Sequence, residues 1–171
     1  MYSFRLNIKN MKTKIISAFP GTGKTYYHKN HPDTTLDSDS SQFSWLYDKN
    51  GNKLYDDDEK PIRNPWFPSN YIEHIKSNIG KYEYIFVSSH KEVREALVDN
   101  CLLFYLIYPD YNDKEIYIER YKQRGSSDDF IKLIENNWEE WIEELEDQES
   151  CFIRQLPKNT TISHLLKYFN D

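Results

Sequence analysis

The chain has 171 residues, of which 38% are hydrophobic, 29% charged and 16% aromatic, and its formal net charge at pH 7 is −6. This length suits one well-buried domain, and the aromatic content is far too high for a disordered chain. The negative net charge argues against a broad nucleic-acid or anionic-membrane surface, since such surfaces are basic.

The distribution of apolar residues predicts a cytoplasmic protein. No apolar run approaches the roughly 20 residues that a membrane span requires, and the initial segment MYSFRLNIKN lacks the apolar core of a signal peptide. We expect residues 1–11 to be an N-terminal extension of a single domain at 12–171. Cys101 and Cys151 are not in CxxC spacing, so each is expected to be a small buried hydrophobe in a reducing compartment.

Five apolar runs of β type alternate with helical patterns along the chain. They span residues 12–19, 34–36, 82–89, 102–108 and 151–156. Because the runs are nearly continuous rather than alternating, they indicate strands that are covered on both faces. We therefore predict a three-layer α/β fold with a five-stranded parallel sheet and helices on both faces.

Periodic apolar positions predict the helices between these strands. The predicted helices span residues 69–79, 91–99, 113–124, 127–148 and 162–169. In the fourth of them, an apolar stripe is more typical of core packing than of a cofactor site. The stripe consists of Ile131, Ile134, Trp138, Trp141 and Leu145.

The segment at about 45–70 interrupts this alternation and predicts a small insertion after the second strand. Asn50 and Gly51 lie between flanking aromatic residues, which is typical of a β-hairpin with a type I′ turn.

The stretch AFPGTGKT follows the first strand and precedes a helix, as a phosphate-binding loop does. In such loops backbone N–H groups and the helix N-terminus surround a phosphate. Gly21 and Gly23 permit the required backbone angles, Lys24 contacts the outer phosphates, and the Thr25 hydroxyl ligates Mg²⁺. We expect the nucleotide phosphates to be held by Pro20, Gly21, Thr22, Gly23, Lys24 and Thr25.

Two carboxylates follow the second strand in the stretch LDSDS. At the end of a strand, Asp37 could hold Mg²⁺ while Asp39 faces the acceptor of the phosphoryl group. A solvated turn with capping side chains is the alternative. A hydroxyl acceptor needs a carboxylate to take its proton, whereas an acceptor phosphate is already ionised and needs arginines. The pair therefore favours a hydroxyl acceptor, or a contact to a sugar hydroxyl of a nucleotide.

The loop AFPGTGKT resembles that of nucleoside monophosphate kinases and related small P-loop kinases, in which Pro-Gly-x-Gly-Lys follows the first strand. Ala18 departs from the glycine at the first position of this pattern. The resemblance extends from residue 12 to about 166, although only short motifs within it are specific. It implies a P-loop kinase fold with ATP and Mg²⁺ as cofactors. The layout is also similar to that of phage-encoded P-loop proteins, which implies nucleotide metabolism in an infected host cell.

The stretch LDSDS is similar to the acidic pair that serves metal and acceptor hydroxyl in shikimate- and gluconate-type kinases. The stretch FVSSHKEVREAL resembles a Ser-x-x-Lys-x-x-Arg pattern of gluconate-kinase-like proteins, which implies that Lys91 and Arg94 reach toward an acceptor phosphate. Plain surface charges on an amphipathic helix are the alternative. The Walker B carboxylate expected near Ser88 is missing, so Thr25 with one aspartate of LDSDS would hold Mg²⁺, partly through water.

Arg120 and Arg124 are four residues apart in IERYKQRGSS and share a helix face. They resemble the RxxxR lid of P-loop kinases, which implies that both stabilise charge on the transferred phosphoryl group. The lid would span about 118–130. Ion pairs with Glu119 or Asp128 are the alternative.

Two further stretches are similar in position to substrate-binding segments of these kinases. Arg63 lies close in sequence to Trp66, Phe67 and Tyr71, a combination that could stack a base and hold a phosphate, although an ordinary aromatic cluster is equally compatible. The stretch QLPKNTTI resembles the loop that lies against the adenine.

Three hypotheses follow. The first is ATP-dependent phosphoryl transfer to a nucleoside or deoxynucleoside monophosphate. The second changes the acceptor to a hydroxyl of a small metabolite, a modified nucleotide or a polynucleotide 5′ end, with Asp39 as base. The third is a non-catalytic nucleotide-binding regulator, which the missing Walker B carboxylate allows.

Overall fold

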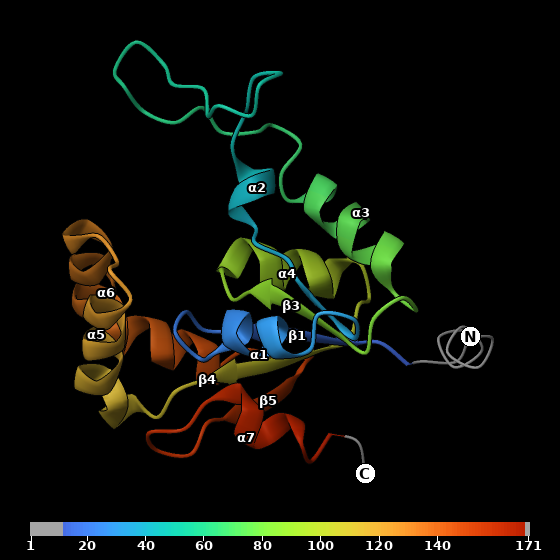
Figure 1. Cartoon of the computed structure of the whole chain (residues 1–171), viewed down its shortest axis with the longest axis vertical. Coiled ribbons are helices and arrows are strands. Elements are labelled where there is room, and N and C mark those ends of the chain that lie inside the picture. The colour runs from blue at the N-terminus through green and yellow to red at the C-terminus, as the bar shows by residue number, and fades with distance from the viewer. Residues whose placement is uncertain (1–11, 170–171) are drawn as a thin grey trace.

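A computed structural model describes residues 12–169, and its central feature is an all-parallel sheet (Figure 1). Within these residues the strands are β1 Lys14–Ala18, β2 Thr35–Asp37, β3 Tyr84–Ser88, β4 Phe104–Tyr108 and β5 Phe152–Gln155. Their order is β2-β3-β1-β4-β5. The predicted α/β class with a five-stranded parallel sheet is confirmed, whereas the predicted extension at 1–11 lies outside the described residues.

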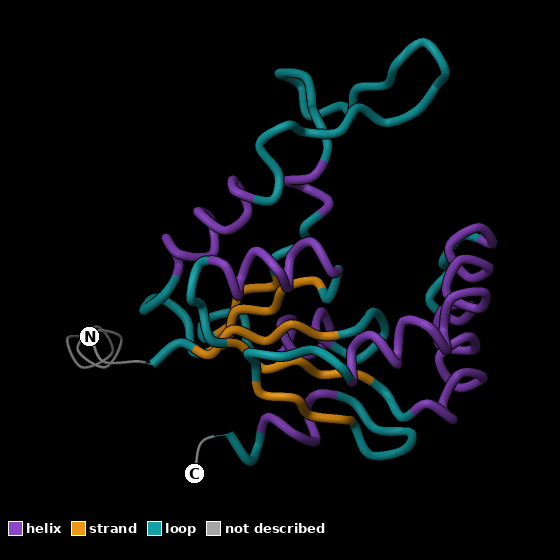
Figure 2. The backbone as a smooth tube through the Cα atoms, turned by 180° about the vertical axis from the view of Figure 1, so that it is seen from behind, coloured by secondary structure: helices purple, strands orange, loops and turns teal. Residues whose placement is uncertain are grey.

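Helices connect the strands and lie on both sides of the sheet (Figure 2). They are α1 Lys24–Asn30, α2 Ser41–Ser44, α3 Ser69–Asn78, α4 Lys91–Asp99, α5 Lys114–Gln123, α6 Asp128–Glu146 and α7 Ile162–Leu166, with a 3-10 turn η2 at Tyr111–Asp113. Because the strands are parallel and the loops after them run to helices, the carboxyl ends of all five strands meet at one edge.

The two faces of the sheet have separate apolar cores, as expected for three layers. One core combines Ile85 and Leu106 of the sheet with residues of α3, α4, α5 and α6. The other combines Ile16 and Phe86 with residues of α7. The predicted stripe on α6 faces the first core, where Trp138 is fully buried and its indole N–H donates to the Tyr111 carbonyl at 2.8 Å. The core-packing interpretation of this stripe is therefore confirmed.

The segment between α2 and α3 projects from the body of the molecule (Figure 1, top). An antiparallel bridge joins Tyr47 and Lys53 on either side of the predicted turn. The predicted turn type is wrong, since a type I′ turn needs positive φ at both central residues and only Gly51, at 83°, has it. The Asp48 carboxylate accepts the Asn50 N–H at 2.8 Å and so stabilises a longer loop.

Cys101 corrects another sequence-based expectation. It is exposed, with a positive φ of 53° in the turn after α4, so the prediction that it is buried is wrong. Cys151 is partly buried. Over residues 12–169, no helix combines the length and the apolar character needed to cross a membrane.

Candidate functional site

The loop between β1 and α1 lies at the carboxyl edge of the sheet, and two glycines determine its backbone path. Gly21 and Gly23 have φ values of 81° and 101°, which glycine adopts without strain. A Cβ atom on Gly21 would lie 2.8 Å from the ring of Tyr121, whose hydroxyl donates to the Pro20 carbonyl at 2.7 Å. The loop is therefore packed directly against α5.

The Lys24 ammonium lies inside this loop. It donates hydrogen bonds to the carbonyl oxygens of Ala18 and Phe19, the second at 3.3 Å. Burial lowers the pKa of Lys24 to about 8, although the carboxylates of Asp37 and Asp39 partly counteract this effect. Among the described residues the cation has no direct ion pair, and it lies in a position where an anionic ligand would stabilise its charge.

The two residues predicted to hold a metal ion are in contact. The Thr25 hydroxyl of α1 donates to the Asp37 carboxylate at the end of β2, at 2.7 Å. Among the described residues there is no group of three or more His, Cys, Asp or Glu that could hold a metal ion. A site of one hydroxyl and one carboxylate fits Mg²⁺, which takes oxygen ligands, keeps several waters and completes its shell with substrate phosphates.

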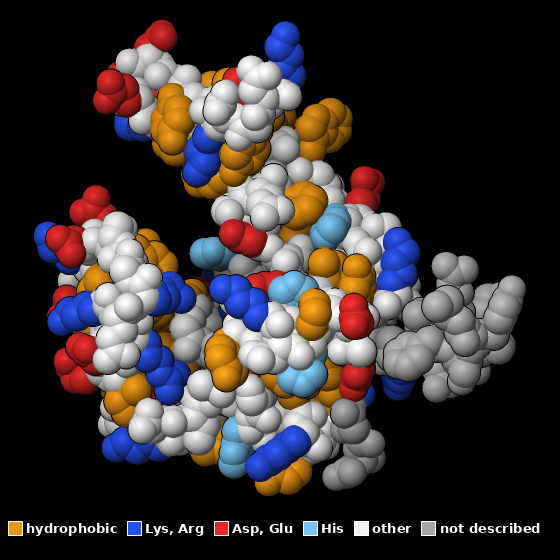
Figure 3. Space-filling model, viewed as in Figure 1, with side chains coloured by type: hydrophobic (Ala, Val, Ile, Leu, Met, Phe, Trp, Pro, Cys, Tyr) orange, Lys and Arg blue, Asp and Glu red, His pale blue; other side chains and the backbone are white. Residues whose placement is uncertain are grey.

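The two predicted lid arginines lie beside the loop. Arg120 donates to the Gly21 carbonyl at 3.3 Å and to the Thr160 carbonyl at 3.2 Å. Arg124 stacks on Tyr121, with its guanidinium carbon 4.8 Å from the ring centre. Both arginines line a cavity of about 380 Å³ together with Lys24. Lys and Arg side chains gather around the hollow between the α5–α6 pair and the rest of the molecule (Figure 3).

The alternative interpretation of these arginines is not observed. Among the ion pairs of the described residues, none joins either arginine to Glu119 or Asp128. The Arg124 Nε atom donates to the Ser126 hydroxyl at 2.8 Å instead. The two guanidinium groups are therefore held by carbonyls, a hydroxyl and aromatic rings, and no carboxylate within residues 12–169 forms an ion pair with them.

Sequence reasoning missed Asp113, which orders the loop after β5. Its side chain is buried, and one carboxylate oxygen accepts the Asn159 N–H at 2.8 Å. The start of α7, which follows this loop, touches the phosphate loop, because the Ile162 N–H donates to the Thr22 carbonyl at 2.9 Å. The only sequence feature that could have indicated Asp113 is its position at the start of a helix, where aspartate is common.

A second cavity, of about 610 Å³, lies on the side of Lys24 that faces the projecting insertion. Asp37 and Asp39 both line it. The Asp39 carboxylate accepts the N–H of Ser41 at 2.9 Å and the Ser41 hydroxyl at 2.8 Å. Asp39 thus stabilises a turn through its side chain, as the alternative interpretation of LDSDS predicted. It also borders a cavity that an acceptor could enter.

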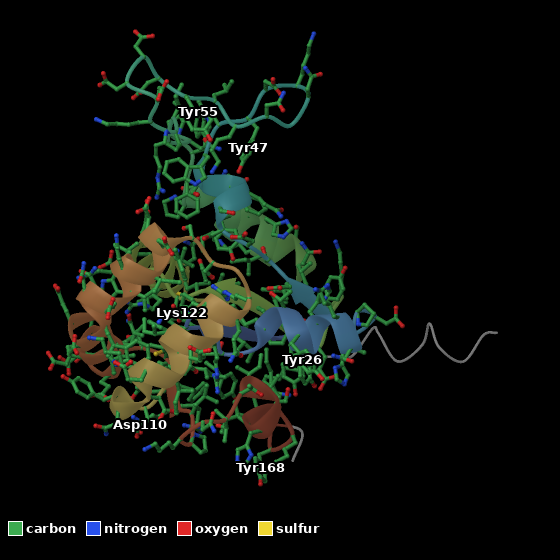
Figure 4. All side chains as sticks on the ribbon, turned by 60° about the vertical axis from the view of Figure 1, so that its left-hand side comes forward. Tyr26, Tyr47, Tyr55, Asp110, Lys122 and Tyr168 are labelled. Atoms are coloured by element: carbon green, nitrogen blue, oxygen red, sulfur yellow. The ribbon has the colours of Figure 1, made fainter. Side chains whose placement is uncertain are left out.

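Arg63 lines the outer part of this cavity. Its guanidinium forms an ion pair with Glu92 and lies over the rings of Trp45 and Phe67, at 5.4 and 4.7 Å from their centres. Trp66, which was expected to contribute, is 74% exposed. Tyr47 and Tyr55 lie further out on the insertion, far from Tyr26 of α1 (Figure 4). One side of the cavity, which we call the aromatic wall, therefore consists of the rings of Trp45 and Phe67 with the Arg63 guanidinium between them, and this guanidinium is already paired with Glu92.

Lys91 and Arg94 have different environments. Arg94 is only 2% exposed, and its guanidinium donates to the Ser89 carbonyl at 2.9 Å and to Gln148 and Glu144 of the α6 end. It is not a plain surface charge, because it ties α4 to α6, and it also lines a smaller cavity of about 190 Å³ with Lys24 and Ser88 at the sheet edge. Lys91 remains exposed, 3.8 Å from Glu144, and borders the 610 Å³ cavity.

A comparison with protein-family models found no matching family, and a comparison with curated proteins found no match. The similarity to P-loop kinases therefore stays a prediction that rests on motifs of this sequence. The geometry adds that the residues of these motifs meet at one edge of the sheet, where Lys24 lines cavities of about 610, 380 and 190 Å³.

Proposed function

We propose that this protein is an ATP-dependent phosphotransferase that uses Mg²⁺. The observation that supports the proposal best is the convergence of three groups on one loop. These are the phosphate lysine Lys24, the Thr25–Asp37 hydrogen bond, and the unneutralised arginines Arg120 and Arg124. A protein that only binds a nucleotide does not require two cations beside the phosphates, so the regulator hypothesis is less well supported.

Each group has a role in phosphoryl transfer. The backbone N–H groups of residues 20–25 and the Lys24 ammonium would bind the phosphates of ATP. Arg120 and Arg124 would stabilise negative charge that spreads over the transferred group. Thr25 and Asp37 would hold Mg²⁺, which when bound neutralises phosphate charge. The cavity that Asp39 borders would admit the acceptor.

The charges around the acceptor cavity support a hydroxyl acceptor better than an acceptor phosphate. The Asp39 carboxylate, which holds no metal ion in this scheme, would repel a phosphate dianion. Arg94 donates to three protein acceptors, and Arg63 is paired with Glu92. A carboxylate beside the transferred group can instead take the proton of a hydroxyl. We therefore infer that the second hypothesis accounts for the site better than transfer to a nucleoside monophosphate.

The aromatic wall suggests what else the acceptor carries. Trp45 and Phe67 present ring faces beside Arg63, and such surfaces stack planar rings. A nucleoside, a nucleotide or a polynucleotide 5′ end combines such a ring with a hydroxyl. Nucleoside monophosphates stay the second candidate, because Arg63 and Lys91 could exchange their carboxylate partners for a phosphate.

The test is an acceptor panel in which ATP consumption and the phosphorylated product are both measured. Nucleosides, oligonucleotides with a free 5′-hydroxyl, small sugars and deoxynucleoside monophosphates are compared. Lys24→Ala should abolish transfer and leave the circular dichroism spectrum unchanged; unchanged turnover would refute the proposal. If no acceptor stimulates ATP consumption although ATP binds, the protein is a regulator.

Two variants separate the acceptor classes. With a hydroxyl acceptor, Asp39→Asn should lower kcat by roughly 100-fold or more, since general base catalysis contributes about 10²–10⁴-fold. With a phosphate acceptor, Asp39→Asn should change kcat only a few-fold, while Arg63→Ala should raise the acceptor KM more than tenfold.

A further inference from the structure

Two serine hydroxyls at the carboxyl edge of the sheet are buried and have no hydrogen-bond partner within the described part of the chain. They are the Oγ atoms of Ser38, which follows β2, and of Ser88, which ends β3. Both serines line the 610 Å³ cavity beside Thr25 and Asp37. Buried polar groups in native proteins are nearly always paired, and an exception suggests a bound water or ion.

The sheet register places these serines on opposite faces. Asp37 is the register partner of Phe86, and partners on neighbouring parallel strands point to the same face. Ser88 comes two residues after Phe86 and so shares its face and that of Asp37. This is the face on which Thr25 of α1 reaches Asp37. Ser38 follows Asp37 directly and points to the other face.

The neighbours of Ser88 are those of a metal–phosphate site. Ser88 is the register partner of Ala18, whose carbonyl accepts a hydrogen bond from the Lys24 ammonium. The Ser88 carbonyl is fixed by the Ser17 hydroxyl at 3.1 Å, so its backbone is held in place. Ser88 borders the same cavity as Thr25 and Asp37, so a rotation about χ1 to another staggered position is the movement that would turn Oγ toward a water bound there.

We propose that the Ser88 hydroxyl binds a water molecule of the hydrated Mg²⁺ held by Thr25 and Asp37. It would thereby do part of the work of the carboxylate that is absent from the end of β3. Mg²⁺ dehydrates reluctantly and is usually held through several waters, which a neutral hydroxyl can accept as hydrogen-bond donors. This inference rests on the proposed function, because it assumes that a Mg²⁺–nucleotide complex binds at the loop.

The test measures binding rather than turnover, and no acceptor is present. The affinity for a non-hydrolysable ATP analogue is measured by titration calorimetry in Mg²⁺ and again in EDTA. The Kd in EDTA divided by the Kd in Mg²⁺ gives the factor by which the metal tightens binding. Ser88→Ala should reduce this ratio about fivefold, the size of one net hydrogen bond, without changing the affinity in EDTA. Ser88→Asp should weaken binding in EDTA and increase the ratio.

Three further variants make the result specific. Asp37→Asn should reduce the ratio strongly. Ser88→Thr, which keeps the hydroxyl, should retain it. Ser38→Ala removes the unpaired serine hydroxyl on the opposite face of the sheet and should leave the ratio unchanged.

The outcomes distinguish this inference from the proposed function. If the analogue binds more tightly with Mg²⁺ but the ratio in Ser88→Ala equals that of the wild type, the role of Ser88 is refuted and the kinase proposal stands. An equal decrease in Ser38→Ala would also refute it. If the analogue does not bind the wild type at all, both proposals fail.

Discussion

Raising the pH from 7 to 9 should weaken nucleotide binding about tenfold, because the binding lysine loses its proton in this range. Burial lowers the pKa of Lys24 to about 8 in the free protein. The ammonium is then protonated in about 90% of molecules at pH 7 and about 10% at pH 9. If only the protonated form binds phosphate, affinity follows this fraction, and the loss corresponds to about 1.4 kcal/mol.

The assay is titration calorimetry with the ATP analogue in Mg²⁺ at half-unit pH intervals. The matched control is Lys24→Arg, since a guanidinium stays charged throughout this range. We compare the slopes of log Kd against pH, so a general loss of affinity in the variant does not matter. Equal slopes in the two proteins, or a flat wild-type profile between pH 7 and 9, would refute the reasoning.

The same lowered pKa has a consequence for the free energy of unfolding. In the unfolded chain the pKa of Lys24 is 10.5, so between about pH 8 and 10.5 only the unfolded state holds this proton. Stability therefore rises with pH across this window. Below pH 8 the folded protein carries a partly buried charge, which costs at most on the order of 3 kcal/mol. Lys24→Met should thus be more stable than the wild type to urea at pH 7, and a less stable variant would contradict this.

Two further predictions concern packing around the site, and urea denaturation tests both. Arg94→Met should lower the free energy of unfolding by about 2–4 kcal/mol, because it leaves the partners of a buried guanidinium unpaired. The exposed control Lys91→Met should change it by less than about 0.5 kcal/mol. Similar losses in the two variants would show that Arg94 does not hold α4 and α6 together. Gly21→Ala should cost about 2–4 kcal/mol and weaken nucleotide binding, since its Cβ would meet a tyrosine ring at 2.8 Å. Gly51→Ala, with a similar φ but open space, should cost only about 1 kcal/mol and leave binding unchanged.

Local features of the chain were predictable because they depend on neighbouring residues. The helix at 91–99 has the predicted bounds, and each predicted strand agrees with the structure to within a few residues. The glycines of the phosphate loop were predictable from the positive φ that such a loop requires. The contact between Thr25 and Asp37 was anticipated because parallel strands end at a common edge.

The sequence by itself thus determined the layers, the sheet and the loop at its edge, since apolar periodicity and turn residues act over a few positions. Only the tertiary structure decided which side chains remain available there. Arg94 is tied to Gln148, 54 positions away, and Asp113 to Asn159, 46 positions away. Ser88 carries an unpaired hydroxyl only because of what packs around it. Such hydrogen bonds depend on how segments far apart in the sequence pack against each other, and the pattern of neighbouring residues does not specify this packing.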